Sequence, residues 1–246
     1  MTIPSTLPLL GLAHGSRDLR SAAAIEELMV AVAALRPGLR TSAAFLDLSD
    51  PDLPTALARL DVNRAVVVPL LFAQAFHATK DVPDAVQAAS RSTGTDLITG
   101  KILGTGPDVL AVLQVTTGAA GVPDDQEILL LAVGTSDPIA NAAVDDLAAR
   151  WSSARKGGVR AVFATTAPRA VDTLDALNHD KEQIATQAER QSPAVVPLFL
   201  APGLLLDQVA RRARQVGVPV ADPLWPAMAQ VVLDRYDAAV AERLDR

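Results

Sequence analysis

Two kinds of segment alternate along this chain: short runs that are almost wholly apolar, and longer stretches whose apolar residues recur every three or four positions. The short runs are predicted strands, at 7–13, 41–46, 64–70, 96–103, 127–133, 159–164, 194–199 and 218–221. The longer stretches are predicted helices, at 21–35, 53–60, 80–92, 107–116, 138–153, 168–177, 181–191, 204–215 and 226–244. This alternation is typical of parallel βαβ units. Strands without a polar face indicate that helices cover both sides of each sheet. We therefore predict an α/β fold with doubly wound parallel sheets.

The same pattern occurs twice. Residues 12–18 read LAHGSRD and residues 131–137 read LAVGTSD, an offset of 119 positions between Leu12 and Leu131. A second match joins VVPL at 67–70 to VVPL at 195–198. The repeat predicts two similar domains, residues 1–122 and 123–246. Gly, Pro and Asp residues within 118–126 are typical of a linker between them.

The histidines do not follow the repeat. Of the three histidines, His14 and His77 lie in the first half, where the second half has Val133 and Leu205 at the corresponding positions. A packing role would tolerate the same residue in both halves, so the asymmetry favours a single active site in the first half. The third, His179, has no repeat partner and is predicted to lie at the surface.

Three side chains that can bind a metal follow three predicted strands. His14 comes directly after the first strand, Asp47 directly after the second, and His77 lies in the loop after the third. Ligands of open α/β sheets bind beyond the carboxyl ends of the strands, so all three belong to one sheet edge. Two imidazoles and a carboxylate suit Fe(II), Co(II), Ni(II) or Zn(II), and an imidazole also accepts a proton near neutral pH. The pattern does not distinguish a resident catalytic metal from a metal that is bound only in passing. Asp47 is either a carboxylate of the site or a turn residue, since aspartate is common in turns.

Composition excludes several classes of function. The chain has 246 residues and a net charge of −6 without a basic tract, so we expect no nucleic-acid partner. The absence of cysteine excludes disulfides, thiolate metal sites and a cysteine nucleophile. We expect a cytoplasmic protein without a signal peptide, because no basic region and apolar core begin the chain. No apolar run reaches the roughly 18–20 residues of a membrane helix, so no membrane partner is expected.

Taken together, the motifs resemble a known family, the class II sirohydrochlorin chelatases. The resemblance is carried by HGSR at 14–17, FLD at 45–47, the segment VPLLF…H…DVP at 68–83, and LG followed by Pro107 at 103–107. This family includes single-chain siroheme ferrochelatases and cobaltochelatases of the anaerobic cobalamin route. The resemblance implies two α/β domains that face each other across a cleft holding a tetrapyrrole, with the metal-handling residues in one domain.

The resemblance also implies roles for individual residues. His14 and His77 would bind the incoming metal and take up pyrrole protons, with Asp47 where the family usually has glutamate. The metal, Fe(II) or Co(II) with Ni(II) as a further option, would be a substrate, and no cofactor would be permanently bound. Donors for the substrate's carboxylates are expected from the side chains near the histidines and from the equivalent turn of the second half: Ser16, Arg17, Lys80, Thr135 and Ser136. Arg20 is either a further donor or part of a solvated helix face.

The expected function is insertion of Fe(II) into sirohydrochlorin by a monomer. A cobaltochelatase is the first alternative, and a metal or tetrapyrrole carrier without turnover is the second. A protoporphyrin ferrochelatase is less favoured, because few aromatic residues are available to line an apolar cleft. A hydrolase that uses Ser16 lacks the Gly-x-Ser-x-Gly elbow.

Overall fold

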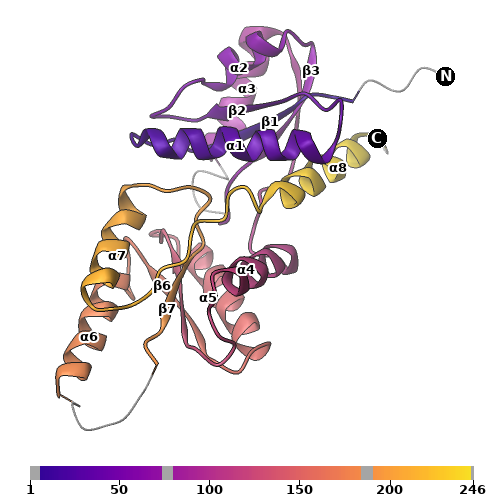
Figure 1. Ribbon diagram of the computed structural model, residues 1–246. Helices are drawn as coiled ribbons and strands as arrows, with labels where there is room; N and C mark the ends of the chain where they lie inside the picture. The colour runs from indigo at the N-terminus through magenta and orange to yellow at the C-terminus, as the bar shows by residue number, and fades with distance from the viewer. Residues whose placement is uncertain (1–5, 74–79, 184–190, 245–246) are drawn as a thin grey trace. The chain divides into compact units, whose positions relative to one another are not determined.

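The computed structural model describes residues 6–73, 80–183 and 191–244. These fold into two compact units (Figure 1). Unit 1 consists of residues 1–104 and 225–246, and unit 2 of residues 105–224. Each unit is an α/β sandwich with a parallel sheet at its centre, as the apolar pattern predicts.

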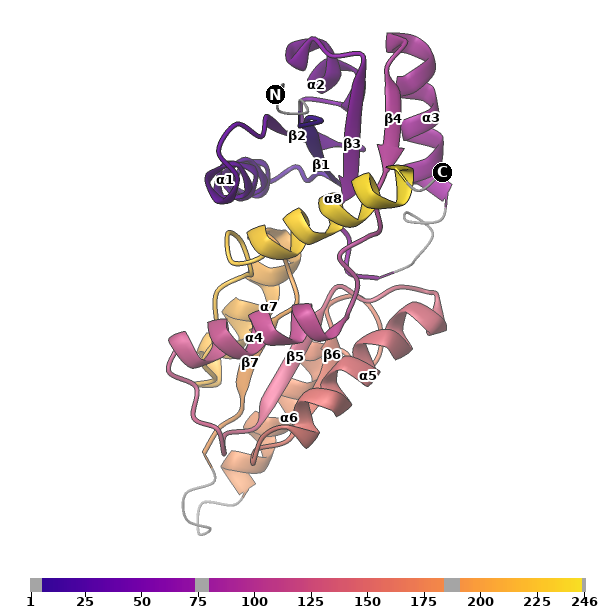
Figure 2. The ribbon, with the colours of Figure 1, turned by 90° about the vertical axis from the view of Figure 1, so that its right-hand side faces the viewer.

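Unit 1 is built on a four-stranded parallel sheet in the order β2-β1-β3-β4. The strands are β1 (Leu9–Ala13), β2 (Thr41–Phe45), β3 (Arg64–Pro69) and β4 (Asp96–Thr99). One face of the sheet packs against α2 (Leu53–Leu60) and α3 (Val82–Thr93) around Leu10, Leu12 and Val67. The other face is covered by α1 (Leu19–Leu35) and α8 (Ala229–Leu244), as Figures 1 and 2 show. Helices on both faces confirm the predicted double winding.

Unit 2 has a smaller parallel sheet in the order β6-β5-β7. Its strands are β5 (Ile128–Ala132), β6 (Val159–Phe163) and β7 (Ala194–Pro197). The helices α6 (Ala170–Gln183) and α7 (Leu204–Gln215) pack on one face around Leu129 and Leu131. The other face carries α4 (Pro107–Ala119) and α5 (Pro138–Ser153) (Figure 2). Among the described residues, no helix combines the length and the apolar character needed to cross a membrane.

The predicted repeat is confirmed down to the backbone of its first turn. β1 and β5 are related by the offset of 119 positions, and each leads to a glycine with positive φ, +96° at Gly15 and +85° at Gly134. Asp18 and Asp137 then cap the following helices with nearly the same dihedrals, φ/ψ −85°/113° and −81°/112°. Each carboxylate accepts a hydrogen bond from the backbone N–H two residues ahead.

The domain boundaries differ from the prediction of 1–122 and 123–246. Helix α4 belongs to unit 2 and α8 to unit 1, so each unit includes a helix from the other half of the sequence repeat. Helix α8 packs against α1, β3 and β4, and Arg36 forms an ion pair with Asp237. The repeat identifies equivalent strands and turns. The apolar face of a helix shows that the helix packs on a sheet, but it does not indicate which of the two sheets.

The predicted linker at 118–126 is also part of unit 2. Arg155 Nη2 donates a hydrogen bond to Pro123 O (2.6 Å), and Gly157 N donates one to Asp124 O (2.8 Å). The amide of Gln126 is buried and donates to Ser192 O (2.6 Å). The segment forms a turn inside unit 2. Glycine and proline favour turns within a domain as well as linkers between domains, so their presence does not distinguish the two.

Several predicted elements have different bounds, among them the strand expected at 96–103, which ends at Thr99 as β4. Residues 168–177 and 181–191 were expected as separate helices, whereas α6 continues through the polar segment 178–180, which contains neither glycine nor proline to end it. The predicted strand at 218–221 is reduced to a single bridge between Val220 and Val195.

Tyr236 on α8 gives a direct test of how this helix is attached. Its hydroxyl donates a hydrogen bond to Leu7 O (2.8 Å), and burial raises the pKa of this phenol above its ordinary value of 10.0. We expect Tyr236→Phe to lower the free energy of unfolding by about 1 kcal/mol at pH 7, because Leu7 O loses its partner. Urea unfolding measures this change.

The raised pKa also gives a pH dependence of known sign. The folded state favours the neutral phenol, so this contribution is present below pH 10.0 and is lost as the pH rises through the folded-state pKa. Because the chain has one tyrosine, the phenolate absorbance reports this residue alone. A midpoint at or below 10.0 in the folded protein would contradict the attachment of α8.

Candidate active site

The predicted site residues His14 and Asp47 are neighbours across two adjacent strands. β1 and β2 pair in parallel register, ending with Ala13 opposite Phe45. The hydrogen-bond pattern continues one step beyond the strands, since Leu46 N donates to Ala13 O (2.9 Å) and Asp47 N donates to His14 O (2.9 Å). Both residues thus lie at the carboxyl edge of the unit 1 sheet, meaning the edge where its strands have their carboxyl ends. His14 is half-buried and Asp47 is exposed.

Gly15 allows this close approach of the two loops. A Cβ atom on Gly15 would lie 1.7 Å from the carbonyl oxygen of Asp47, far inside van der Waals contact. Its φ of +96° is also a conformation that favours glycine. The loops are joined further by two hydrogen bonds: Ser16 N donates to Ser49 Oγ (3.0 Å), and Ser49 Oγ donates to Ser16 O (2.9 Å). The turn after β1 and the loop after β2 therefore form one braced unit.

The carboxylate of Asp47 has one oxygen engaged in its own loop. Its Oδ1 accepts a hydrogen bond from Leu48 N (2.8 Å). The other oxygen has no hydrogen bond to any residue that the structure describes. An exposed carboxylate oxygen of this kind can accept a proton or bind a cation.

The hydroxyls of Ser16 and Thr135 hold equivalent places in the two units. Ser16 Oγ accepts a hydrogen bond from Asp18 N (3.1 Å), and Thr135 Oγ1 accepts one from Asp137 N (3.2 Å). Since each hydroxyl acts here as an acceptor, its own proton can be donated to an anion. Ser16, Thr135 and Ser136 were predicted as substrate contacts, and the structure places all three at the carboxyl edge of their own sheet.

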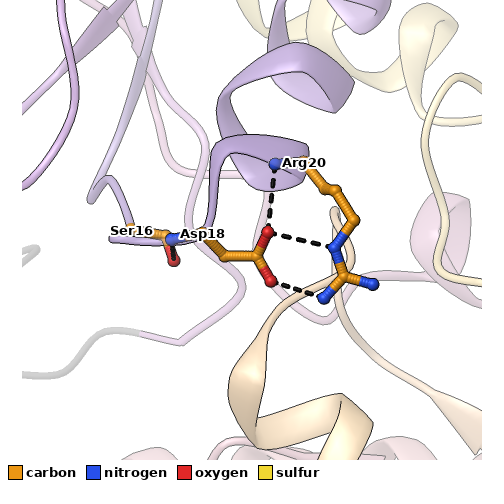
Figure 3. Close-up of polar contacts among 3 residues, drawn as sticks. All are labelled: Ser16, Asp18 and Arg20. Atoms are coloured by element: carbon orange, nitrogen blue, oxygen red, sulfur yellow. Dashed lines mark hydrogen bonds and ion pairs between the residues drawn. The ribbon is translucent and has the colours of Figure 1, made fainter.

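The two arginines after His14 differ in their surroundings. Arg20 donates from Nε and Nη2 to the two carboxylate oxygens of Asp18 (Figure 3). These hydrogen bonds hold the pKa of Asp18 below its ordinary value. Arg17 is exposed and forms no ion pair with any described residue. Of the two arginines, Arg17 is therefore the one whose charge is not offset by an ion pair with a described residue.

The remaining predicted residues are placed as follows. Lys80 is exposed, two residues before α3. His179 is exposed on α6, as predicted. His77 lies outside the described residues, so its predicted place beside His14 stays a prediction. Within the described ranges, no group of three or more His, Cys, Asp or Glu is arranged to hold a metal ion.

Unit 2 has the same backbone edge with different side chains. Thr165 N donates to Val133 O (3.0 Å), which reproduces the bond from Asp47 to His14. Val133 and Leu205 are 44% and 37% exposed at the places where unit 1 carries its histidines. The equivalence of Thr165 and Asp47 was missed by sequence reasoning, although aligning β2 with β6 gives it. Among the described residues, the edge of unit 2 thus carries Val133 and Thr165 where the edge of unit 1 carries His14 and Asp47.

The chain is similar to several known proteins. Residues 8–118 match the family model described as CbiX. The sirohydrochlorin ferrochelatase of Bacillus subtilis (strain 168) is 26% identical over 180 residues, which cover 70% of this chain and 66% of that protein. The chain thus spans just under two thirds of the curated relative's length.

Two solved structures share the fold over nearly the whole chain. One is SirB from Bacillus subtilis with Fe3+, with a TM-score of 0.77, 21% identity and 98% of both chains covered. The other is the sirohydrochlorin chelatase SirB from Bacillus subtilis subspecies spizizenii in complex with cobalt, with a TM-score of 0.75, 19% identity and 95% of both chains covered. At these identities the likeness shows a common fold with two parallel-sheet units.

Substitution of Gly15 tests the bracing of the two loops. We expect Gly15→Ala to destabilise the protein, because both the positive φ and the approach of Asp47 O oppose a Cβ atom. The matched control is Gly38→Ala, with φ +88° and nothing within 4 Å of the added atom. The control should cost about 1–2 kcal/mol of conformational strain, and Gly15→Ala at least ~1–3 kcal/mol more from overpacking. Equal losses in urea unfolding would contradict the close approach.

Proposed function

We propose that this chain, a member of the class II sirohydrochlorin chelatase family, inserts a divalent metal ion into sirohydrochlorin. The observation that carries the proposal is that the carboxyl edges of the two sheets share a backbone hydrogen bond but carry different side chains. Hydrogen bonding joins the loops of His14 and Asp47 in unit 1, and the same bonding joins Val133 and Thr165 in unit 2. One sheet edge thus retains residues that bind metal and accept protons, while its copy does not.

The reaction needs groups that hold the metal briefly and accept two protons. A divalent ion replaces two pyrrole protons, so the macrocycle loses two H⁺ as four nitrogens bind the metal. His14 and His77 bind the incoming ion through neutral imidazole nitrogens, and a site with so few protein ligands can release it to the macrocycle. The imidazoles also accept pyrrole protons near neutral pH. Asp47 supplies negative charge beside the ion through its oxygen that is not bonded to Leu48.

The carboxylates around the macrocycle meet donors at the carboxyl edges. Ser16 and Arg17 precede α1, Lys80 precedes α3, and Thr135 and Ser136 precede α5. In unit 1, Ser16, Arg17 and Lys80 bind substrate carboxylates, and the first backbone N–H groups of the helices add to the anion affinity. Thr135 and Ser136 precede the equivalent helix of unit 2 and stay predicted substrate contacts. Because several contacts involve charge, substrate affinity falls as ionic strength rises.

Fe(II) is the metal we assign first, and Co(II) is the alternative. The Bacillus subtilis relative is named a ferrochelatase, and SirB structures hold Fe3+ in one case and cobalt in another. Imidazole and carboxylate ligands suit both ions, so selection in the cell follows availability. The metal is a substrate here. The monomeric state and the cytoplasmic location stay predictions.

Replacement of His14 tests its role. His14→Ala should lower the rate of metal insertion by about 10²-fold or more, since it removes both a ligand and a general base. The control is His179→Ala, which changes an exposed histidine of α6 and should leave the rate unchanged. Anaerobic absorbance spectroscopy with sirohydrochlorin and excess Fe(II) or Co(II) follows the product. Wild-type turnover by His14→Ala would overturn the assignment, and wild-type conversion that stops at one equivalent would indicate a carrier.

Asp47 needs a pair of variants, because it also caps its own loop. Asp47→Asn keeps the oxygen that accepts from Leu48 N but loses the negative charge, so we expect slower insertion with unchanged stability. Asp47→Glu keeps the charge on a side chain one methylene longer and should retain most of the rate. If Asp47→Asn inserts metal at the wild-type rate in the same absorbance assay, Asp47 is a turn residue only.

A further inference from the structure

Leu48 combines two unfavourable features at the candidate active site. It has a φ of +61°, a left-handed conformation in which a leucine Cβ crowds the neighbouring backbone. Its side chain is also 46% exposed, so burial does little to offset this strain. Conformational strain of this kind is concentrated at ligand-binding and catalytic sites.

The loop that carries Leu48 is held firmly against the turn after β1. Asp47, one residue before, is bonded to His14, and Ser49, one residue after, is bonded twice to Ser16. Leu48 N itself donates to Asp47 Oδ1. Leu48 therefore lies on a backbone that is hydrogen-bonded to the turn carrying His14 and Ser16, one residue after Asp47.

Comparison within the chain shows that this conformation is not required by the fold. The other non-glycine residue with positive φ among the described residues is Asp61, with φ +48° at the C-cap of α2. Aspartate tolerates this conformation, and helix C-caps commonly adopt it. The position in unit 2 that corresponds to Leu48 is Thr166, which does not have a positive φ. The strained apolar residue thus occurs only in the unit that carries His14.

We propose that Leu48 is a substrate-binding residue that contacts the apolar face of the tetrapyrrole macrocycle while the metal is inserted. This inference rests on the proposed function. Sirohydrochlorin combines a flat, largely apolar ring with a charged periphery, so its recognition needs an apolar contact beside the ionic ones. Ser16 and Arg17, which follow His14 in the chain, offer a hydroxyl and a cation, and Leu48 supplies the apolar contact. Removing it weakens ground-state binding more than it slows the chemical step.

The test compares Leu48→Gly, Leu48→Asn and Leu48→Met with Asp61→Gly. Leu48→Gly relieves the strain, so its urea midpoint should rise, while KM for sirohydrochlorin should increase about tenfold, as expected for loss of an apolar contact, with kcat little changed. Leu48→Asn suits the left-handed conformation without an apolar side chain and should show the same rise in KM. Leu48→Met restores an apolar side chain and should have a KM near that of the wild type.

The control variant distinguishes the effect of relieving backbone strain from the effect of losing a contact with the substrate. Asp61→Gly should raise the urea midpoint and leave KM unchanged, because α2 ends at the opposite edge of the sheet. Unchanged KM in both Leu48→Gly and Leu48→Asn, with normal wild-type insertion, would overturn the inference and leave the proposed function standing.

A second readout is binding of metal-free sirohydrochlorin, measured by absorbance titration. If the wild type binds sirohydrochlorin but inserts no metal, the proposed function fails, and the dissociation constants of the Leu48 variants still decide the inference. An increase in both variants supports it, and wild-type affinity overturns it. No binding by the wild type overturns both.

Discussion

The hydrogen bond from Asp47 N to His14 O is the interaction on which the candidate active site depends. It extends the β1–β2 pairing beyond the strands themselves. As a result, His14 and Asp47 lie next to each other at the carboxyl edge of the sheet. It exists only because residue 15 has no Cβ, which would otherwise overlap the carbonyl of Asp47. Ser16 and Ser49 reinforce it with two further hydrogen bonds. A site braced by backbone contacts can exchange a weakly held ion without losing its shape.

The second unit has the same backbone hydrogen bond at its carboxyl edge but different side chains there. Gly134 also has a positive φ, and Thr165 N donates a hydrogen bond to Val133 O as Asp47 N does to His14 O. The caps at Asp18 and Asp137 are also equivalent. The two units therefore share the backbone of the first turn and of the helix cap, whereas the loop after the second strand differs, with a positive φ at Leu48 but not at Thr166. Of the described residues, His14 and Asp47, which we propose to handle the metal, occur on the unit 1 edge alone, and hydroxyls that can donate to anions occur on both edges.

Much of this could be predicted from the sequence, because strands and turns have local signals. Apolar runs located the strands within about four residues, apart from 218–221, which forms only a bridge. The two LAxGxxD segments located the turns and their aspartate caps. The assignment of α4 to unit 2 and of α8 to unit 1 could not be predicted, because the sequence of a helix does not indicate which of the two sheets it packs against. The left-handed Leu48 had no signal either, because leucine disfavours that conformation. Its strain is visible only in the folded backbone.

The central claim is that one metal-handling edge exists and that it lies in unit 1. Diffraction from crystals soaked with Co(II), recorded at the cobalt absorption edge, tests it most directly. The account predicts one anomalous peak within bonding distance of His14 and none beside Val133 or His179. A peak at the unit 2 edge, or insertion activity in crystals whose only peak lies away from His14, would contradict the account.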